Sequence, residues 1–174
     1  VRKYGGKIYY GDVTLPDILR AAGIEQAKVF VLAIDDVEDS MNVARHIRLN
    51  YPEVTVLARA RDRYHMHLLR DLGIKHVWRE TYLSSLDMSR EILEVLCTPP
   101  QTARKTVQMF RDYDDGLIER QRAIYDDEAQ LIASAQSAIR ELESLFDSDM
   151  TTAKKESQKE SQREKEKDLD RKSS

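Results

Sequence analysis

The stretch Lys28 to Asp36, KVFVLAIDD, decides the fold of this chain. An unbroken apolar run from Val29 to Ile34 is followed by two adjacent carboxylates. A short apolar run rich in β-branched residues is typical of a strand buried on both faces in a parallel sheet. Ligands of open α/β sheets bind outside the carboxyl ends of the strands, so Asp35 and Asp36 are candidate contacts to a ribose or a cation. The alternative is that one of them caps the next helix.

Composition excludes several classes of function. Of the 174 residues, 34% are charged and the net charge is only −3, so no basic field attracts nucleic acid and we expect no nucleic-acid partner. The single cysteine, Cys97, excludes an internal disulfide and is interpreted as a packing residue. No apolar run approaches the roughly 18 residues that cross a bilayer, so we expect this segment to be soluble. Because Val1 opens on a pattern typical of a helix end, we expect that an N-terminal portion precedes it.

Strand and helix patterns alternate four times between Lys7 and Thr98. The predicted strands are 7–10, 28–34, 54–60 and 75–78. The predicted helices are one capped by Thr14 and ended by Gly23, then 38–50, 63–72 and 80–98. Connections of this length fit right-handed parallel crossovers, which predicts a doubly wound α/β layer with its last three strands adjacent and parallel.

After Pro100 the pattern is helical alone. An apolar or aromatic residue recurs at every seventh position over a long span, which predicts a long amphipathic helix with a narrow apolar seam. The residues of this seam are Ile118, Tyr125, Ile132, Ile139 and Phe146. That seam could pack on its own domain or on a partner subunit. From Thr151 onward, charges of both signs alternate without an apolar stripe, and we expect this tail to be disordered.

Few motifs of chemistry are present. Arg59 and Arg61 lie on the same side of a strand's carboxyl end, where they form a candidate anion fork; the alternative is an ion pair with Asp62, Asp35 or Asp36. His65 and His67 point to different faces of a helix, so a metal site is not predicted. The sequence holds no G-x-S-x-G, H-E-x-x-H, P-loop or G-x-G-x-x-G motif. We therefore expect no enzyme.

Four motifs occur in order, KYGGKIYYGDVT, AGIEQAKVFVLAIDD, ARARDR and RET. Together they resemble the nucleotide-binding regulatory (RCK, TrkA-N-like) domain of bacterial glutathione-gated potassium efflux antiporters, the Kef family. The resemblance covers roughly Arg2 to Arg120. It implies a partial Rossmann-like parallel sheet, whose glycine-rich loop and first strands would precede Val1, followed by C-terminal helices and the charged tail. The expected domains are 1–97, partial Rossmann-like and regulatory, 98–150, a helical extension and candidate dimer contact, and 151–174, the disordered tail.

The resemblance also implies a ligand site for glutathione. Arg79, in RET, matches a glutathione-binding arginine, and Asp114 stands where some members carry an asparagine that binds the peptide. Tyr4 matches an aromatic residue that the bulky group of a glutathione adduct displaces. Glutathione would keep the antiporter closed, and adducts would open it.

A nucleotide site and partners are implied in the same way. Asp12, Asp35 and Arg59 would flank an adenine nucleotide, NAD(H) or AMP, and Asp62 matches an acidic residue that holds the closed state. The implied partners are a second copy in a homodimer, the membrane potassium/proton antiporter domain of the same protein, and an ancillary oxidoreductase-like subunit. The implied location is the cytoplasmic face of the bacterial inner membrane.

Two other classes of protein share some of these sequence features. One is a fragment of a nicotinamide-dependent oxidoreductase, for which no persuasive base and hydride-acceptor pair is present. The other is a phosphoacceptor receiver domain, a class suggested by the acidic pair Asp35 and Asp36 at the end of a strand. That class needs a lysine at the end of its last strand, where this chain has Arg79 after Trp78.

Overall fold

The computed structural model describes residues 10–146 and divides into two compact units between Ser89 and Arg90. The first unit contains the sheet and the second contains helices alone. The predicted strand 7–10 for all but its last residue, the site residue Tyr4 and the tail 151–174 lie outside the described residues.

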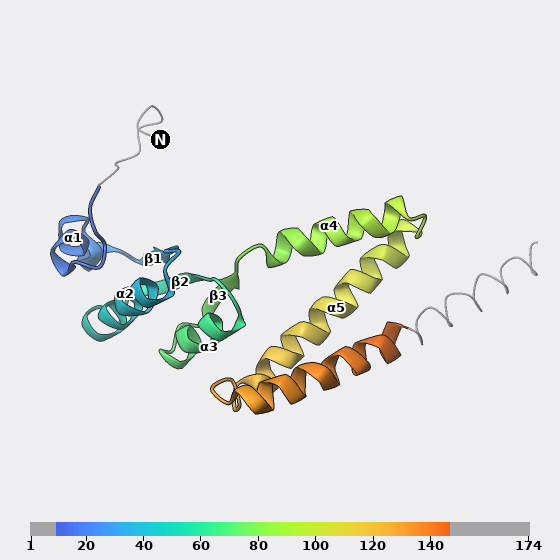
Figure 1. Cartoon of the computed structure of the whole chain (residues 1–174). Helices are drawn as coiled ribbons and strands as arrows, with labels where there is room; N and C mark the ends of the chain where they lie inside the picture. Colours follow the sequence, from blue (N-terminus) through green and yellow to red (C-terminus); the bar gives the residue numbers. More distant parts are fainter. Residues whose placement is uncertain (1–9, 147–174) are drawn as a thin grey trace, which may run out of the picture. The chain divides into compact units, whose positions relative to one another are not determined.

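The sheet of the first unit has three parallel strands, β1 (Val29–Leu32), β2 (Thr55–Ala60) and β3 (His76–Arg79), in the order β1-β2-β3 (Figure 1). Val29 pairs with Thr55, and Leu57 pairs with His76. The partial Rossmann-like parallel sheet and the predicted adjacency of its three strands are therefore confirmed.

Helices α2 (Val37–Asn50) and α3 (Arg63–Asp71) begin directly after β1 and β2, because an aspartate caps each of them. The Asp36 carboxylate accepts the N–H of Asp39 at 2.9 Å, and the Asp62 carboxylate accepts the N–H of His65 at 2.8 Å. The interpretation that one of the two carboxylates after β1 is a helix cap is thus confirmed for Asp36.

The first helix, α1 (Pro16–Ala21), begins differently from the prediction. Its N-cap is Leu15, without a side-chain hydrogen bond, so the prediction of a Thr14 cap is wrong. Asp12 accepts both the N–H of Thr14, at 2.9 Å, and its hydroxyl, at 2.6 Å, and this removes the hydroxyl from the helix end. A short 3-10 turn, η2 (Ile24–Gln26), then leads into β1.

The core of the first unit lies between one face of the sheet and the helices α2 and α3. The strands contribute Leu32, Val56, Ala58, Ala60 and Val77, and the two helices contribute Met41, Val43, Ala44, Ile47, Met66 and Leu69, all buried. These helix residues recur at spacings of three and four, so each helix lays an apolar stripe on the sheet.

The opposite face of the sheet is open among the described residues. Val29 is 50% exposed, Val31 is 66% exposed, and Trp78 is also exposed. The prediction that the central run is buried on both faces is therefore wrong for Val29 and Val31 within the described residues, since α2 and α3 cover the same face. An apolar run shows that both faces of a strand carry apolar side chains, but it does not show which elements cover those faces.

The second unit is a helical hairpin. After α4 (Tyr82–Val95), which crosses the unit boundary, come α5 (Pro100–Gln121) and a helix over 128–146, and these two run side by side (Figure 1). The Tyr113 hydroxyl donates to the Ala138 carbonyl at 3.2 Å, and the Gln121 amide donates to the Ser134 hydroxyl at 3.2 Å.

The prediction of one long helix through this region is wrong. Residues 122–126 form turns, and Asp127 caps a new helix by accepting the N–H of Gln130 at 3.0 Å and its side-chain amide at 2.7 Å. The seven-residue spacing is thus divided between two antiparallel helices, with Tyr125 in the turn. Ile118 is buried, whereas Ile132 and Ile139 are exposed.

Candidate functional site

The candidate site lies at the carboxyl edge of the sheet, where all three strands end. Parallel pairing brings Asp35 after β1, Arg59 and Arg61 on and after β2, and Glu80 after β3 to this one edge. Ligands of open parallel sheets bind at such an edge. Two arginines and two carboxylates therefore share the place where a ligand would lie.

Arg59 ties the three strand ends together. Its Nη1 lies 2.8 Å from Oε1 of Glu80, while its Nη2 donates to the Asp35 carboxylate and, at 3.1 Å, to the carbonyl of Ala33. Of the two alternatives for this arginine, the structure shows the ion pair, with Asp35 among its predicted partners. Glu80 was not predicted as a partner of Arg59, although Glu80 and Trp78 have the same parity and Trp78 pairs with Arg59 in the register.

Arg61 and His65 fix the turn from β2 into α3. The Arg61 guanidinium donates to the Asp35 carbonyl at 3.4 Å, and the Arg61 backbone N–H donates to Nδ1 of His65 at 3.2 Å. His65 is fully buried. Burial lowers its pKa, while the charges of Asp62 and Glu80 act in the opposite direction. The ring is thus held neutral as a hydrogen-bond acceptor. Within residues 10–146, no three histidine, cysteine or acidic side chains gather as metal ligands would.

Arg79 ends β3, and a tight turn follows it. Its guanidinium carbon lies 3.7 Å from the centre of the Tyr82 ring, a cation–π contact. Between them, Thr81 has φ +57°, and the N–H of Tyr82 donates to the Glu80 carbonyl at 2.6 Å. A β-branched residue rarely adopts positive φ, so this turn is strained. Arg79 is therefore held by an aromatic platform at the end of a short, stiff connection.

The remaining predicted site residues lie apart from this edge or have local roles. Asp12 bonds Thr14, whose hydroxyl is the main cause that lowers the pKa of the Asp12 carboxyl. Asp62 caps α3. Asp114 lies on α5 in the second unit and is only 1% exposed. The sequence pattern could not show this burial, because an aspartate in a charged helix is ordinarily on the surface.

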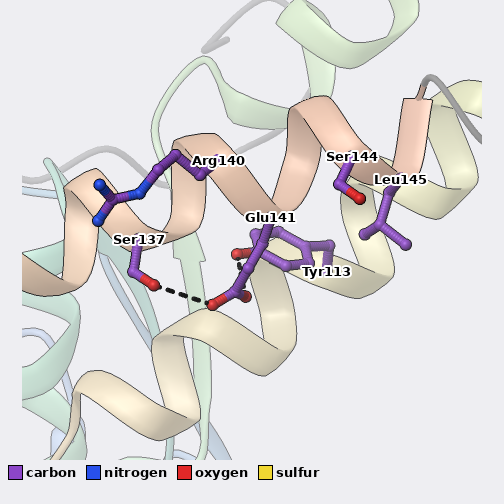
Figure 2. A pocket seen from close by; sticks show the side chains of 6 residues that line it. All are labelled: Tyr113, Ser137, Arg140, Glu141, Ser144 and Leu145. Carbon is purple, nitrogen blue, oxygen red and sulfur yellow. Dashed lines mark hydrogen bonds between the residues drawn. The ribbon is translucent and has the colours of Figure 1, made fainter.

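A pocket of about 470 Å³ lies between α5 and the helix 128–146 (Figure 2). Glu141 accepts the Tyr113 hydroxyl at 2.7 Å and the Ser137 hydroxyl at 3.2 Å, whereas Arg140 points away from Tyr113. Burial and the bond to Glu141 raise the pKa of Tyr113, and that same bond is the main cause that lowers the pKa of Glu141. None of the predicted ligand residues lines this pocket.

Comparison with known proteins adds family matches over both parts of the chain. Residues 1–80 match the TrkA-N domain, and residues 84–166 match the potassium efflux system KefB C-terminal domain. A Kef C-terminal domain of Shewanella denitrificans in AMP-bound form is 29% identical, with a TM-score of 0.66, and the match covers 68% of this chain and 75% of that one. The GsuK RCK domain is 24% identical, with a TM-score of 0.41, over 42% of this chain and 16% of that one.

These matches and the sheet identify the chain as a regulatory domain of the RCK class, with a Rossmann-like part and an attached helical part. More particularly, it belongs to the Kef-type domains, and its role is regulatory in a potassium efflux system. In residues 10–146, no helix has both the length and the apolar character to cross a membrane.

Proposed function

We propose that this chain is the ligand-sensing part of a glutathione-regulated potassium/proton antiporter. Glutathione bound to it keeps the transport domain closed, and bulky glutathione adducts open it. The observation that carries this proposal is the consecutive pair of family matches, TrkA-N over residues 1–80 and KefB C-terminal over 84–166. Gating requires only that each ligand binds two arrangements of the domain with different free energies, so no catalytic residue is needed.

Arg79 is the proposed glutathione contact. Glutathione carries two carboxylates and an ammonium, and a guanidinium can bind a carboxylate through two parallel hydrogen bonds. The Tyr82 ring supports Arg79 at 3.7 Å and fixes the plane of its guanidinium, which favours such directed binding. Asp114 of the second unit and Tyr4 complete the proposed ligand set.

An adenine nucleotide, AMP or NAD(H), is the second proposed ligand, bound at the carboxyl edge beside Asp35 and Arg59, with Asp12 as a further flanking residue. The AMP-bound state of the Shewanella relative supports an adenine nucleotide as the ligand. Asp62, the cap of α3, is proposed to stabilise the closed state.

The proposed assembly is a homodimer joined to the membrane antiporter domain of the same protein at the cytoplasmic face of the bacterial inner membrane, with an ancillary oxidoreductase-like subunit. The test is potassium efflux from cells that express the intact antiporter. Efflux should be slow with normal glutathione, faster after glutathione depletion, and fastest when an electrophile converts glutathione into bulky adducts. Efflux that is the same in all three conditions contradicts glutathione gating.

A further inference from the structure

The two proposed ligand sites meet at one ion pair. Arg59, at the edge proposed for the nucleotide, lies 2.8 Å from the Glu80 carboxylate, and Glu80 immediately follows the proposed glutathione contact Arg79. Both residues belong to the first unit, so their contact is defined within one compact body.

Glu80 is connected rigidly to the platform under Arg79. Its N–H donates to the Ala60 carbonyl at 2.8 Å, and its carbonyl accepts the N–H of Tyr82 at 2.6 Å across the strained Thr81. A displacement of Glu80 must therefore move Tyr82, or change the turn that places Tyr82 under the Arg79 guanidinium.

The two carboxylates on Arg59 respond differently to an anion. Asp35 is 85% exposed and follows β1 on a loop, so its side chain can turn into solvent without moving the chain. Glu80 is only 30% exposed and shares its surroundings with Asp62 and His65. A phosphate that approaches Arg59 repels both carboxylates, and only Glu80 transmits that repulsion to another part of the structure.

We propose that the Arg59–Glu80 ion pair couples the two ligand sites. A nucleotide phosphate binds the Arg59 guanidinium in place of the Glu80 carboxylate. The displaced Glu80 loosens the turn 79–82, and this weakens glutathione binding. The inference rests on the proposed function for the identity of the two ligands. Because binding linkage is reciprocal, glutathione weakens nucleotide binding by the same factor. The ion pair thus makes nucleotide occupancy a regulator of glutathione sensitivity.

The test is calorimetric titration of glutathione into the purified intact antiporter, with and without saturating AMP. In the wild type, AMP should raise the glutathione Kd by about fivefold or more, the usual lower range of allosteric coupling. Glu80→Gln keeps the size and hydrogen-bonding capacity of the side chain but removes its charge, so the Kd should no longer respond to AMP.

Asp35→Asn is the matched control, because it neutralises the other carboxylate on the same guanidinium. Because Asp35 also flanks the proposed nucleotide site, the AMP Kd of this variant is measured first, and at saturating AMP the variant should keep the AMP effect on glutathione. If the effect survives in Glu80→Gln and is lost in Asp35→Asn, the phosphate displaces Asp35 and the proposed coupling is wrong. Glutathione binding that ignores AMP in the wild type overturns the coupling alone, whereas absence of any glutathione binding overturns the proposed function as well.

Discussion

Replacing Arg79 by alanine should remove most of the response of the antiporter to glutathione and its adducts. The lost interaction is a charge-assisted hydrogen bond, which contributes about 1.5 to 3 kcal/mol. That free energy corresponds to a Kd about 10- to 150-fold higher. Arg79→Lys should recover only part of the response, because lysine offers a point charge in place of a planar fork.

The same substitution should change stability far less. In the free chain the half-buried Arg79 stacks on Tyr82 at 3.7 Å, and the loss of this cation–π contact alone costs about 0.5 to 1 kcal/mol. For a unit of this size, the Tm should fall by roughly 2 to 8 °C. Arg79→Ala therefore separates a ligand contact from a structural arginine, whose loss would unfold the first unit or abolish nucleotide binding too.

The assay is potassium efflux from cells, with thermal unfolding of the same purified variants. Arg45→Ala is the matched control, since Arg45 is exposed on α2 and bonds the Asn42 side chain at 3.1 Å. The Arg45→Ala substitution also removes one positive charge but leaves the edge of the sheet unchanged, so the variant antiporter should respond to glutathione and its adducts as the wild type does. Normal gating by glutathione and its adducts in a stably folded Arg79→Ala antiporter would refute the assignment.

Three further outcomes are expected. Burial lowers the pKa of His65 below its ordinary 6.5, so the folded chain binds fewer protons than the unfolded chain. The free energy of unfolding should therefore be largest above that pH and fall below it; urea unfolding should show this, and His65→Asn should weaken the dependence. Asp127→Ala removes the cap of the helix 128–146 and should cost about 0.5 to 2 kcal/mol, measured by thermal unfolding, whereas the neighbouring Asp126→Ala should have a smaller effect. This chain alone should bind adenine nucleotides poorly, since its sequence holds no G-x-G-x-x-G loop, whose backbone N–H groups receive nucleotide phosphates, and a micromolar Kd by calorimetry would contradict that expectation.

The local structure of the sheet could be predicted because its signals are local. The run after Lys28 predicts β1, and the acidic pair that follows it predicts a helix cap, which Asp36 supplies, whereas the cap of α3 by Asp62 was not predicted. Coverage of the sheet is a tertiary property, however, and alternation of apolar residues does not reveal it. The same limit applies after Pro100, where a seven-residue spacing continues through the turn at 122–126 and only the capping pair Asp127 and Gln130 marks the break.

The position of the candidate site at the carboxyl edge of the sheet could be predicted from the sequence, but the ion-pair partners of Arg59 could not. Parallel strands deliver their carboxyl ends to one edge, so Asp35 and Arg59 were expected together. Choosing among carboxylates for Arg59 required the register, which places Trp78 opposite Arg59 and therefore Glu80 on the same face. Without the register, the sequence predicts only that Glu80 begins the helix 80–98, whereas α4 begins at Tyr82.

Asp114 shows how burial changes the meaning of a predicted ligand residue. At 1% exposure, its carboxylate can reach glutathione only if the packing of α5 opens, whereas Arg79 already lies at a strand end. Opening a packed helix to expose a charge requires free energy that the ligand must supply, so a role for Asp114 implies a conformational change on binding. Since gating needs two arrangements with different ligand affinities, a buried carboxylate is a better reporter of that change than a surface one. Arg79 and Asp114 are therefore expected to contribute differently, the first to affinity in either arrangement and the second to the preference between them.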